Sequence, residues 1–255
     1  NELEKITGKE ASTTSEVKDK SSKHMNPFQK FVKMLSDIFV PIIPAIVAGG
    51  LLMGLNNIFT AKDLFYDGKS IIDVHSQFSG LADMINIFAN APFTLLPILI
   101  GFSAAKRFGG NPYLGAALGM ILVHPGLMSA YDFPKALEEG KAIPHWDVFG
   151  LHITEGGYQG QVLPMLVATY ILATIEKWLR KVIPTVLENL LTPLLSIFIT
   201  AFITFLFVGP VTRQLGYWLS DGLTWLYEFG GAIGGLIFGL LYAPIVITGM
   251  HHSFI

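Results

Sequence analysis

Long apolar runs separated by short polar stretches are the main pattern of this chain from residue 38 onward. An α-helix needs about 17 to 25 mainly apolar residues to cross the hydrocarbon core of a bilayer. The pattern therefore predicts an all-α, polytopic helical membrane protein with about seven membrane segments. The predicted segments are 38–59, 81–108, 113–128, 162–178, 190–208, 215–229 and 233–248.

Two of these segments are irregular. The second contains Asn90-Ala91-Pro92, and a break is expected there because proline removes a helical hydrogen bond. The sixth contains Trp218, Ser220 and Asp221, so it has two interpretations: it crosses the bilayer or it lies flat in the membrane interface.

The N-terminal part of the chain differs from the rest. Residues 1–25 are polar and poor in aromatic side chains, and they show no helical or strand period, which is typical of a disordered linker. Residues 26–35 then alternate basic side chains with apolar ones. This alternation predicts an amphipathic approach to the bilayer.

The composition supports the membrane assignment and excludes several other classes of protein and of site. Hydrophobic residues make up 51% of the chain and charged residues only 14%, whereas soluble domains carry about 25% charged residues. A net charge of -2 provides no basic field for nucleic acid. The chain has no cysteine, which excludes a disulfide framework, a thiolate metal site and a cysteine nucleophile within these residues.

Lysine and arginine gather in alternate connections, as the positive-inside rule requires. The distribution places the N-terminus in the cytoplasm and makes the acidic connections external. The basic positions are Lys18, Lys20, Lys23, Lys30, Lys33, Lys106, Arg107, Lys177, Arg180 and Lys181, and the acidic ones are Asp63, Asp67, Asp73, Asp132, Glu138, Glu139, Asp147 and Glu155.

The predicted segments contain many prolines and glycines. Broken backbone at membrane depth is tolerated where it is buried or lines a cavity, so this density favours a transporter over a set of plain anchors. Glycines 234, 235 and 239 have a simpler interpretation as a close-packing face. The prolines within the segments include Pro41, Pro44, Pro97, Pro164, Pro193 and Pro244.

His251 and His252 are adjacent ionisable residues at the end of a long apolar run. Such groups are costly at membrane depth and normally face a cavity or a polar partner, so the pair indicates a functional site. The alternative is that the two histidines cap a membrane helix at the headgroup level.

Four segments carry a resemblance to a known family. They read DIFVPIIPAIVAGGLL at 37–52, FGGNPYLG at 108–115, GYQGQVLP at 157–164 and GMHH at 249–252. In this order they resemble the membrane domain, IIC, of a bacterial phosphotransferase-system sugar permease. The resemblance covers about residues 28–255, and within the glucose superfamily it is nearest to the trehalose and sucrose branch.

The resemblance implies a permease that works with several domains and carrier proteins. A cytosolic IIB domain, phosphorylated on cysteine, would pass its phosphoryl group to a disaccharide held by IIC, with upstream carriers IIA and HPr and a homodimer in the bacterial membrane. It implies that 1–27 is a linker from an upstream IIB domain, that 28–190 holds the dimerisation helices, and that 191–255 begins the sugar-binding half. The family's sugar-binding glutamate would lie beyond this chain, so the fragment alone is expected to be inactive.

The resemblance also implies roles for particular side chains. His251 and His252 would bind sugar hydroxyls or relay a proton, and Tyr242 is a candidate to cover the apolar face of the sugar. No cofactor and no metal are expected. Glu155 imitates the family's glutamate motif but is expected in an external loop, and His124, His145 and His152 are expected as loop or interface histidines, without metal.

Three functions remain open from the sequence. The first is a phosphotransferase permease for a disaccharide, with trehalose preferred and sucrose next. The second is an ion-coupled sugar transporter in which the histidine pair relays protons. The third is a membrane scaffold that transports nothing. A requirement for phosphoenolpyruvate separates the first two, and sugar binding separates both from the third.

Overall fold

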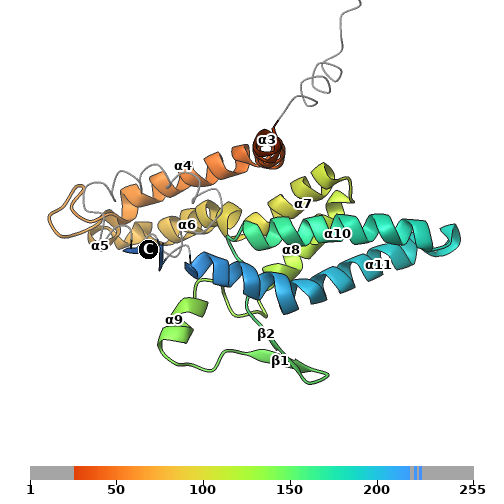
Figure 1. Cartoon of the computed structure of the whole chain (residues 1–255). Coiled ribbons are helices and arrows are strands. Elements are labelled where there is room, and N and C mark those ends of the chain that lie inside the picture. Colours follow the sequence, from red (N-terminus) through yellow and green to blue (C-terminus); the bar gives the residue numbers. More distant parts are fainter. Residues whose placement is uncertain (1–25, 219–220, 223, 226–255) are drawn as a thin grey trace, which may run out of the picture.

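The computed structural model describes residues 26–218, 221–222 and 224–225. These residues are mostly helical, which confirms the predicted class, although one small sheet is also present (Figure 1). The elements are α3 (Pro27–Phe39), α4 (Ile43–Thr60), α5 (Ile71–Val74), η1 (Ser76–Phe78), α6 (Ser79–Thr94), α7 (Leu96–Phe108), α8 (Pro112–Leu122), α9 (Phe133–Glu138), β1 (His145–Val148), β2 (Leu151–Thr154), α10 (Leu163–Val182), α11 (Thr185–Ile203) and the π-helix η2 (Thr204–Val208).

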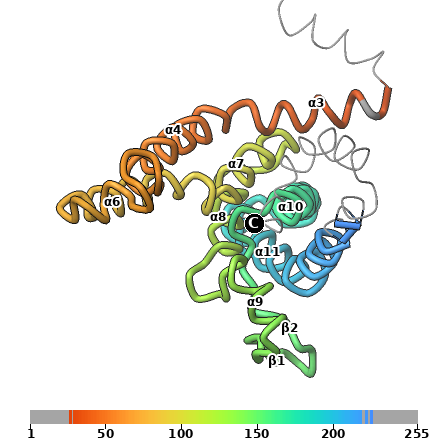
Figure 2. The backbone as a smooth tube through the Cα atoms, turned by 90° about the vertical axis from the view of Figure 1, so that its left-hand side faces the viewer, coloured from red at the N-terminus to blue at the C-terminus, as the bar shows by residue number. Residues whose placement is uncertain are grey.

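Helices α4 and α6 form an antiparallel pair that extends from one side of the molecule (Figure 2). The pair is close at Gly49, where an added Cβ would lie 2.9 Å from the carbonyl oxygen of Ala89. Its outer faces are apolar and exposed, as at Leu51 and Ile87. Exposed apolar side chains on a helix pair are expected where lipid or another subunit covers them.

Helices α7, α8, α10 and α11 form the main bundle, and α3 lies against α7. Side chains from α7, α8 and α10, including Ile100, Leu118 and Leu172, form its fully buried centre. At the α7–α8 crossing, a Cβ added to Gly115 would lie 2.1 Å from the carbonyl oxygen of Gly101. The two backbones therefore touch, which only glycine permits.

The predicted break in the second segment is present. Helix α6 ends at Thr94 and α7 begins at Leu96, a few residues after Asn90-Ala91-Pro92. Pro92 itself lies inside α6, and Pro97 lies in the first turn of α7. The chain therefore bends at Leu95, where Pro97 has no amide hydrogen to continue the ladder of α6.

Three of the prolines assigned to segment interiors begin helices instead. Pro44, Pro97 and Pro164 lie in the first turns of α4, α7 and α10, where the amide hydrogen of a residue has no helical partner anyway. Pro41 lies in the turn between α3 and α4. Among the described residues, Pro92 lies inside α6 and Pro193 lies inside α11. Broken helices are therefore fewer among the described residues than the density of prolines in the sequence indicated.

Among the described residues, fewer helices than predicted are long and apolar enough to cross a bilayer. Three helical runs are long and apolar enough to cross a bilayer: 43–60, 76–108 and 185–218. Helix α8 replaces the third predicted segment but has 11 residues, about 16 Å of helix against a hydrocarbon core of about 30 Å. Helix α10 has 20 residues but carries charged side chains in its last two turns, at Glu176, Lys177, Arg180 and Lys181.

The third long run joins two parts that the sequence separated. Residues 185–218 form one helical run of 34 residues, so the predicted start of the sixth segment at 215 falls within the same helix as the fifth. Residues 1–25, part of the predicted sixth segment and all of the seventh lie outside the described residues.

The sheet was not predicted. Strands β1 and β2 form an antiparallel hairpin that projects from the bundle together with α9 (Figure 1). Phe149 and Gly150, which connect them, both have positive φ (51° and 83°), as a tight two-residue turn requires.

Candidate functional site

The site predicted from the histidine pair lies outside the described residues. His251, His252 and Tyr242 are all in that part of the chain, as is the segment 249–252. Their predicted roles therefore stay predictions. The described residues do contain the other three segments that carried the family resemblance.

The first of these segments is tied to helix α7. Ser103 in α7 donates a hydrogen bond of 2.6 Å to the carbonyl oxygen of Ile38. One turn further along, Arg107 forms an ion pair with Asp37, with 2.9 Å between Nε and Oδ2. Segment 37–52 is therefore attached to the helix that leads into the second segment.

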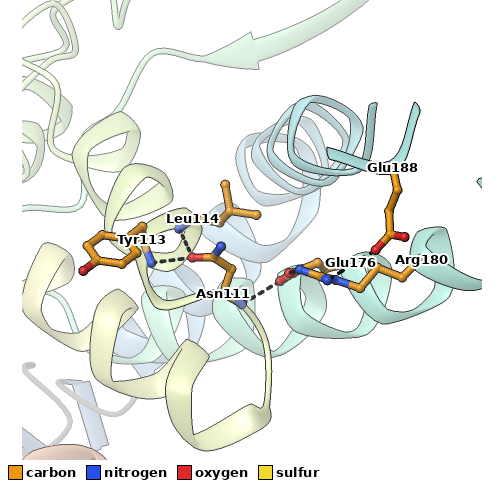
Figure 3. A network of polar contacts seen from close by, with 6 residues as sticks. All are labelled: Asn111, Tyr113, Leu114, Glu176, Arg180 and Glu188. Carbon is orange, nitrogen blue, oxygen red and sulfur yellow. Dashed lines mark hydrogen bonds and ion pairs between the residues drawn. The ribbon is translucent and has the colours of Figure 1, made fainter. Parts of the chain in front are cut away.

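The second segment forms the turn between α7 and α8, and a buried carboxylate supports it (Figure 3). Glu176 of α10 is 2% exposed, and its Oε2 accepts a hydrogen bond of 2.8 Å from the backbone amide of Asn111. The side chain of Asn111 accepts hydrogen bonds from the amides of Tyr113 and Leu114 and so caps α8.

Arginine completes this network. Arg180 lies one turn after Glu176 and approaches its Oε1 to 2.8 Å, and it reaches Glu188 of α11 at 3.4 Å. In Figure 3 the contacts run from the cap of α8 through α10 to α11. The turn is compact because Gly109 has a φ of +73° and a Cβ on Gly110 would lie 3.0 Å from Glu176. These contacts connect α8, α10 and α11.

The third segment enters the centre of the molecule. Gly157 donates to the carbonyl oxygen of Met128, Tyr158 to that of Leu122, and Gly160 to that of Thr94. Residues 156–160 are buried although they belong to no helix or strand. Buried irregular backbone needs internal partners, and these hydrogen bonds supply them.

An arginine of the third long helical run meets this loop. The Arg213 guanidinium carbon lies 3.8 Å from the centre of the Phe133 ring and 5.1 Å from that of Tyr158. Its Nη2 donates to the carbonyl oxygen of Gly157 at 3.4 Å. Tyr158 also packs on Gly209, which has no room for a Cβ. Burial raises the pKa of the Tyr158 hydroxyl, and the charge of Arg213 partly opposes this, so the hydroxyl stays neutral.

Sequence reasoning missed a row of hydroxyls on α11 and η2. Thr192, Ser196, Thr200 and Thr204 recur every fourth residue and are all buried. Thr204 donates to the carbonyl oxygen of Thr200, whereas the hydroxyls of Thr192, Ser196 and Thr200 have no partner among the described residues. The i, i+4 spacing of small hydroxyl residues in an apolar helix was the signal available for this packing face.

The loop histidines and Glu155 have mixed outcomes. His124 is exposed and accepts a hydrogen bond from Gly126, as expected of a loop residue. Glu155 follows β2, and its backbone pairs with Pro144 and Met128. His145 and His152 lie on the hairpin, as expected of loop histidines, and the pairing of the strands brings Asp147 close to both of them; the expectation that they bind no metal stays a prediction.

Known proteins resemble the chain closely. It is 84% identical over 254 residues to the sucrose-specific EIIBC component of the PTS system of Staphylococcus xylosus, covering 100% of this chain and 53% of that protein. It is 59% identical to the sucrose-specific EIIBC component of Vibrio alginolyticus (100% and 53%). It is 50% identical to the trehalose-specific EIIBC component of Bacillus subtilis strain 168 (100% and 54%).

The chain spans about half the length of these relatives. No solved structure matches it. The family model for phosphotransferase system EIIC matches residues 36–255, which include all four segments that carried the resemblance. The chain therefore belongs to the phosphotransferase system EIIC family, the membrane domain of PTS permeases.

Proposed function

We propose that this chain is the sugar-translocating membrane part of a permease that imports sucrose and phosphorylates it. The observation that carries the proposal is its 84% identity, over its whole length, to a relative named sucrose-specific. The predicted order of trehalose before sucrose is reversed, because the trehalose-specific relative is 50% identical whereas two sucrose-specific ones are 84% and 59% identical.

In the proposed reaction the phosphoryl group comes from a phosphocysteine of the IIB domain. The phosphorus–sulfur bond breaks, a phosphorus–oxygen bond to a sugar hydroxyl forms, and the hydroxyl proton leaves. His251 and His252 are the proposed sugar-binding or proton-relay residues, since histidine can donate, accept and titrate near neutrality. Tyr242 is the proposed aromatic contact for the apolar face of the sugar.

The described residues would supply the support for this site. The Glu176 network fastens α8, α10 and α11, and Arg213 holds the buried loop 156–160. The exposed apolar faces of α4 and α6 fit a homodimer contact or lipid. In this proposal residues 1–27 link IIB to the membrane part, 28–190 dimerise, and 191–255 begin the sugar-binding half. IIA and HPr would supply phosphoryl groups to IIB.

The test uses the full-length parent protein in membrane vesicles. Uptake of labelled sucrose and labelled trehalose is measured with and without phosphoenolpyruvate and the general phosphocarrier proteins, for the parent protein and for its His251→Ala and His252→Ala variants. We expect sucrose phosphate to accumulate only with the phosphoryl donor, and at least one histidine variant to lose it.

The same experiment identifies the other functions. Accumulation of unmodified sugar driven by a proton gradient would replace the proposal with an ion-coupled transporter. Absence of both uptake and sugar binding would indicate a scaffold. Faster uptake of trehalose than of sucrose would agree with the proposed phosphoryl transfer but would contradict sucrose as the preferred sugar.

A further inference from the structure

Three side chains with metal-binding atoms share one face of the β1–β2 hairpin. His145 and Asp147 are two residues apart on β1, so both point to the same side. His152 on β2 is the register partner of Asp147. One ligand atom from each residue lies within 4.8 Å of the other two. The pairing of the strands, rather than sequence spacing, brings the three together.

The hydrogen bonding of His145 leaves the correct atom available for a metal. Its Nδ1 lies 3.3 Å from the carbonyl oxygen of Ile143, which can accept only if Nδ1 carries the proton. Nε2 then carries the lone pair, and Nε2 is the atom that faces Asp147, at 3.8 Å from Oδ2. A backbone carbonyl that fixes the far nitrogen of a histidine is the usual outer support of a metal-binding imidazole.

The ligand atoms lie within 4.8 Å of one another, which is near enough to be gathered around one ion. Zinc lies about 2.0 to 2.2 Å from histidine nitrogen and carboxylate oxygen, so neighbouring ligand atoms in a tetrahedron are about 3.4 Å apart. Nδ1 of His152 already contacts Oδ1 of Asp147. The side chains of His145, Asp147 and His152 are 49%, 64% and 75% exposed, so small rotations can bring their ligand atoms around one ion.

We propose that His145, Asp147 and His152 form a binding site for a divalent transition-metal ion, with zinc as the best fit. Two imidazoles and one carboxylate are a ligand set that zinc accepts, and copper and nickel ions would compete for it. Thr154 and Ile143 line the open depression beside the two histidines. A water molecule can enter there and take the fourth position.

The ion would act by joining the two strands of the hairpin. A two-stranded hairpin alone is marginally stable in water. Here its contact with the bundle includes Trp146, whose ring lies 5.4 Å from that of Phe205 in the π-helix η2. A metal bridge between β1 and β2 would therefore order the hairpin at the point where it touches the third long helical run.

The competing explanation is a plain surface ion pair. Asp147 and His152 can pair on the hairpin without any metal, and exposed pairs of this kind contribute little stability. The two explanations differ in what happens when zinc is added. An ion pair binds no stoichiometric zinc, and it gives no ligand-field spectrum when cobalt is added in place of zinc.

The experiment measures zinc and cobalt binding to the full-length parent protein, purified in detergent with a tag that contains no histidine. The variants His145→Ala, Asp147→Asn and His152→Ala are compared with His75→Ala, which removes an exposed histidine from another loop. We expect each site variant to bind one zinc ion fewer per chain, or to bind it roughly tenfold or more weakly. The His75 variant should bind as the parent does.

A variant that should bind zinc more tightly than the parent protein provides a second test, which does not depend on a loss of zinc binding. Thr154 is the register partner of His145, so Thr154→His places a third imidazole, and thus a fourth possible ligand, on the same face. We expect this variant to bind zinc more tightly than the parent protein and its cobalt form to show visible absorption of tetrahedral strength. Equal zinc binding by the parent, the site variants and the Thr154 variant would overturn the proposal.

Discussion

Glu176 is the residue on which the helix connections depend most. It is 2% exposed and accepts from the Asn111 amide while it pairs with Arg180. A buried polar group left without its partner costs roughly 1 to 3 kcal/mol. We predict that Glu176→Ala lowers the free energy of unfolding by about that amount. Thermal unfolding of the detergent-solubilised protein measures the loss.

Glu139→Ala is the matched control for this prediction. Glu139 also pairs with a basic residue, Lys141, but their side chains are 54% and 69% exposed. Exposed pairs contribute about 0 to 1 kcal/mol. If the two variants unfold at the same temperature, Glu176 does not fasten the helices as described.

At the same scale, the sequence showed which residue types were present but not which of them meet. The Glu176 network joins residues 65 positions apart, between Asn111 and Glu176. The hairpin register joins Asp147 to His152, which is the contact on which the proposed metal site depends. Neither contact follows from local spacing, because both depend on how separate elements pack.

Among the helices, the closest approach lies between α7 and α8. Gly101 and Gly115 bring their backbones into contact, and a Cβ added to Gly119 would lie 2.6 Å from the Cα of Ile98 and 2.7 Å from the carbonyl oxygen of Pro97. We predict that Gly115→Ala destabilises the protein because the new methyl group would meet the carbonyl oxygen of Gly101 at 2.1 Å. Overpacking of this kind typically costs about 1 to 3 kcal/mol.

Gly54→Ala is the control, since nothing lies within 4 Å of a Cβ added in the interior of α4. There alanine should raise stability slightly, because glycine costs about 0.5 to 1 kcal/mol in a helix. Thermal unfolding of both variants in detergent checks the pair. Equal melting temperatures for Gly115→Ala and Gly54→Ala would contradict the close contact of α7 and α8.

Hydropathy predicted the helical class and the break before α7, because both depend on local chemistry. It did not predict that α8 would end at 11 residues, or that residues 185–218 would continue as one helix. Helix α8 is apolar because α7, α10 and α11 cover it, and buried helices look like membrane segments in a hydropathy profile. The length of the helix, rather than its hydrophobicity, distinguishes a buried helix from a membrane-spanning one.

At the scale of the whole molecule, the charged connections lie at opposite ends of the bundle. Lys106 and Arg107 end α7, and Arg180 and Lys181 end α10, beside the network of Figure 3. The buried loop 156–160 precedes the other end of α10, and the hairpin follows α9 on that side. The positive-inside rule therefore predicts that the basic end faces the cytoplasm and the hairpin faces the outside.

The absence of cysteine from these residues makes this orientation simple to measure. Phe149 at the hairpin tip is fully exposed, and Lys181 ends α10 at the basic side. In intact cells that make the parent protein with any IIB cysteine replaced by serine, a membrane-impermeant maleimide should label Phe149→Cys at once but should label Lys181→Cys only after the membrane is opened. The reverse pattern would place the N-terminus outside the cell, and with it the linker that the proposal joins to IIB. Since IIB must receive phosphoryl groups in the cytoplasm, that result would also contradict the proposed reaction, whereas the predicted pattern would leave the zinc site facing the external medium.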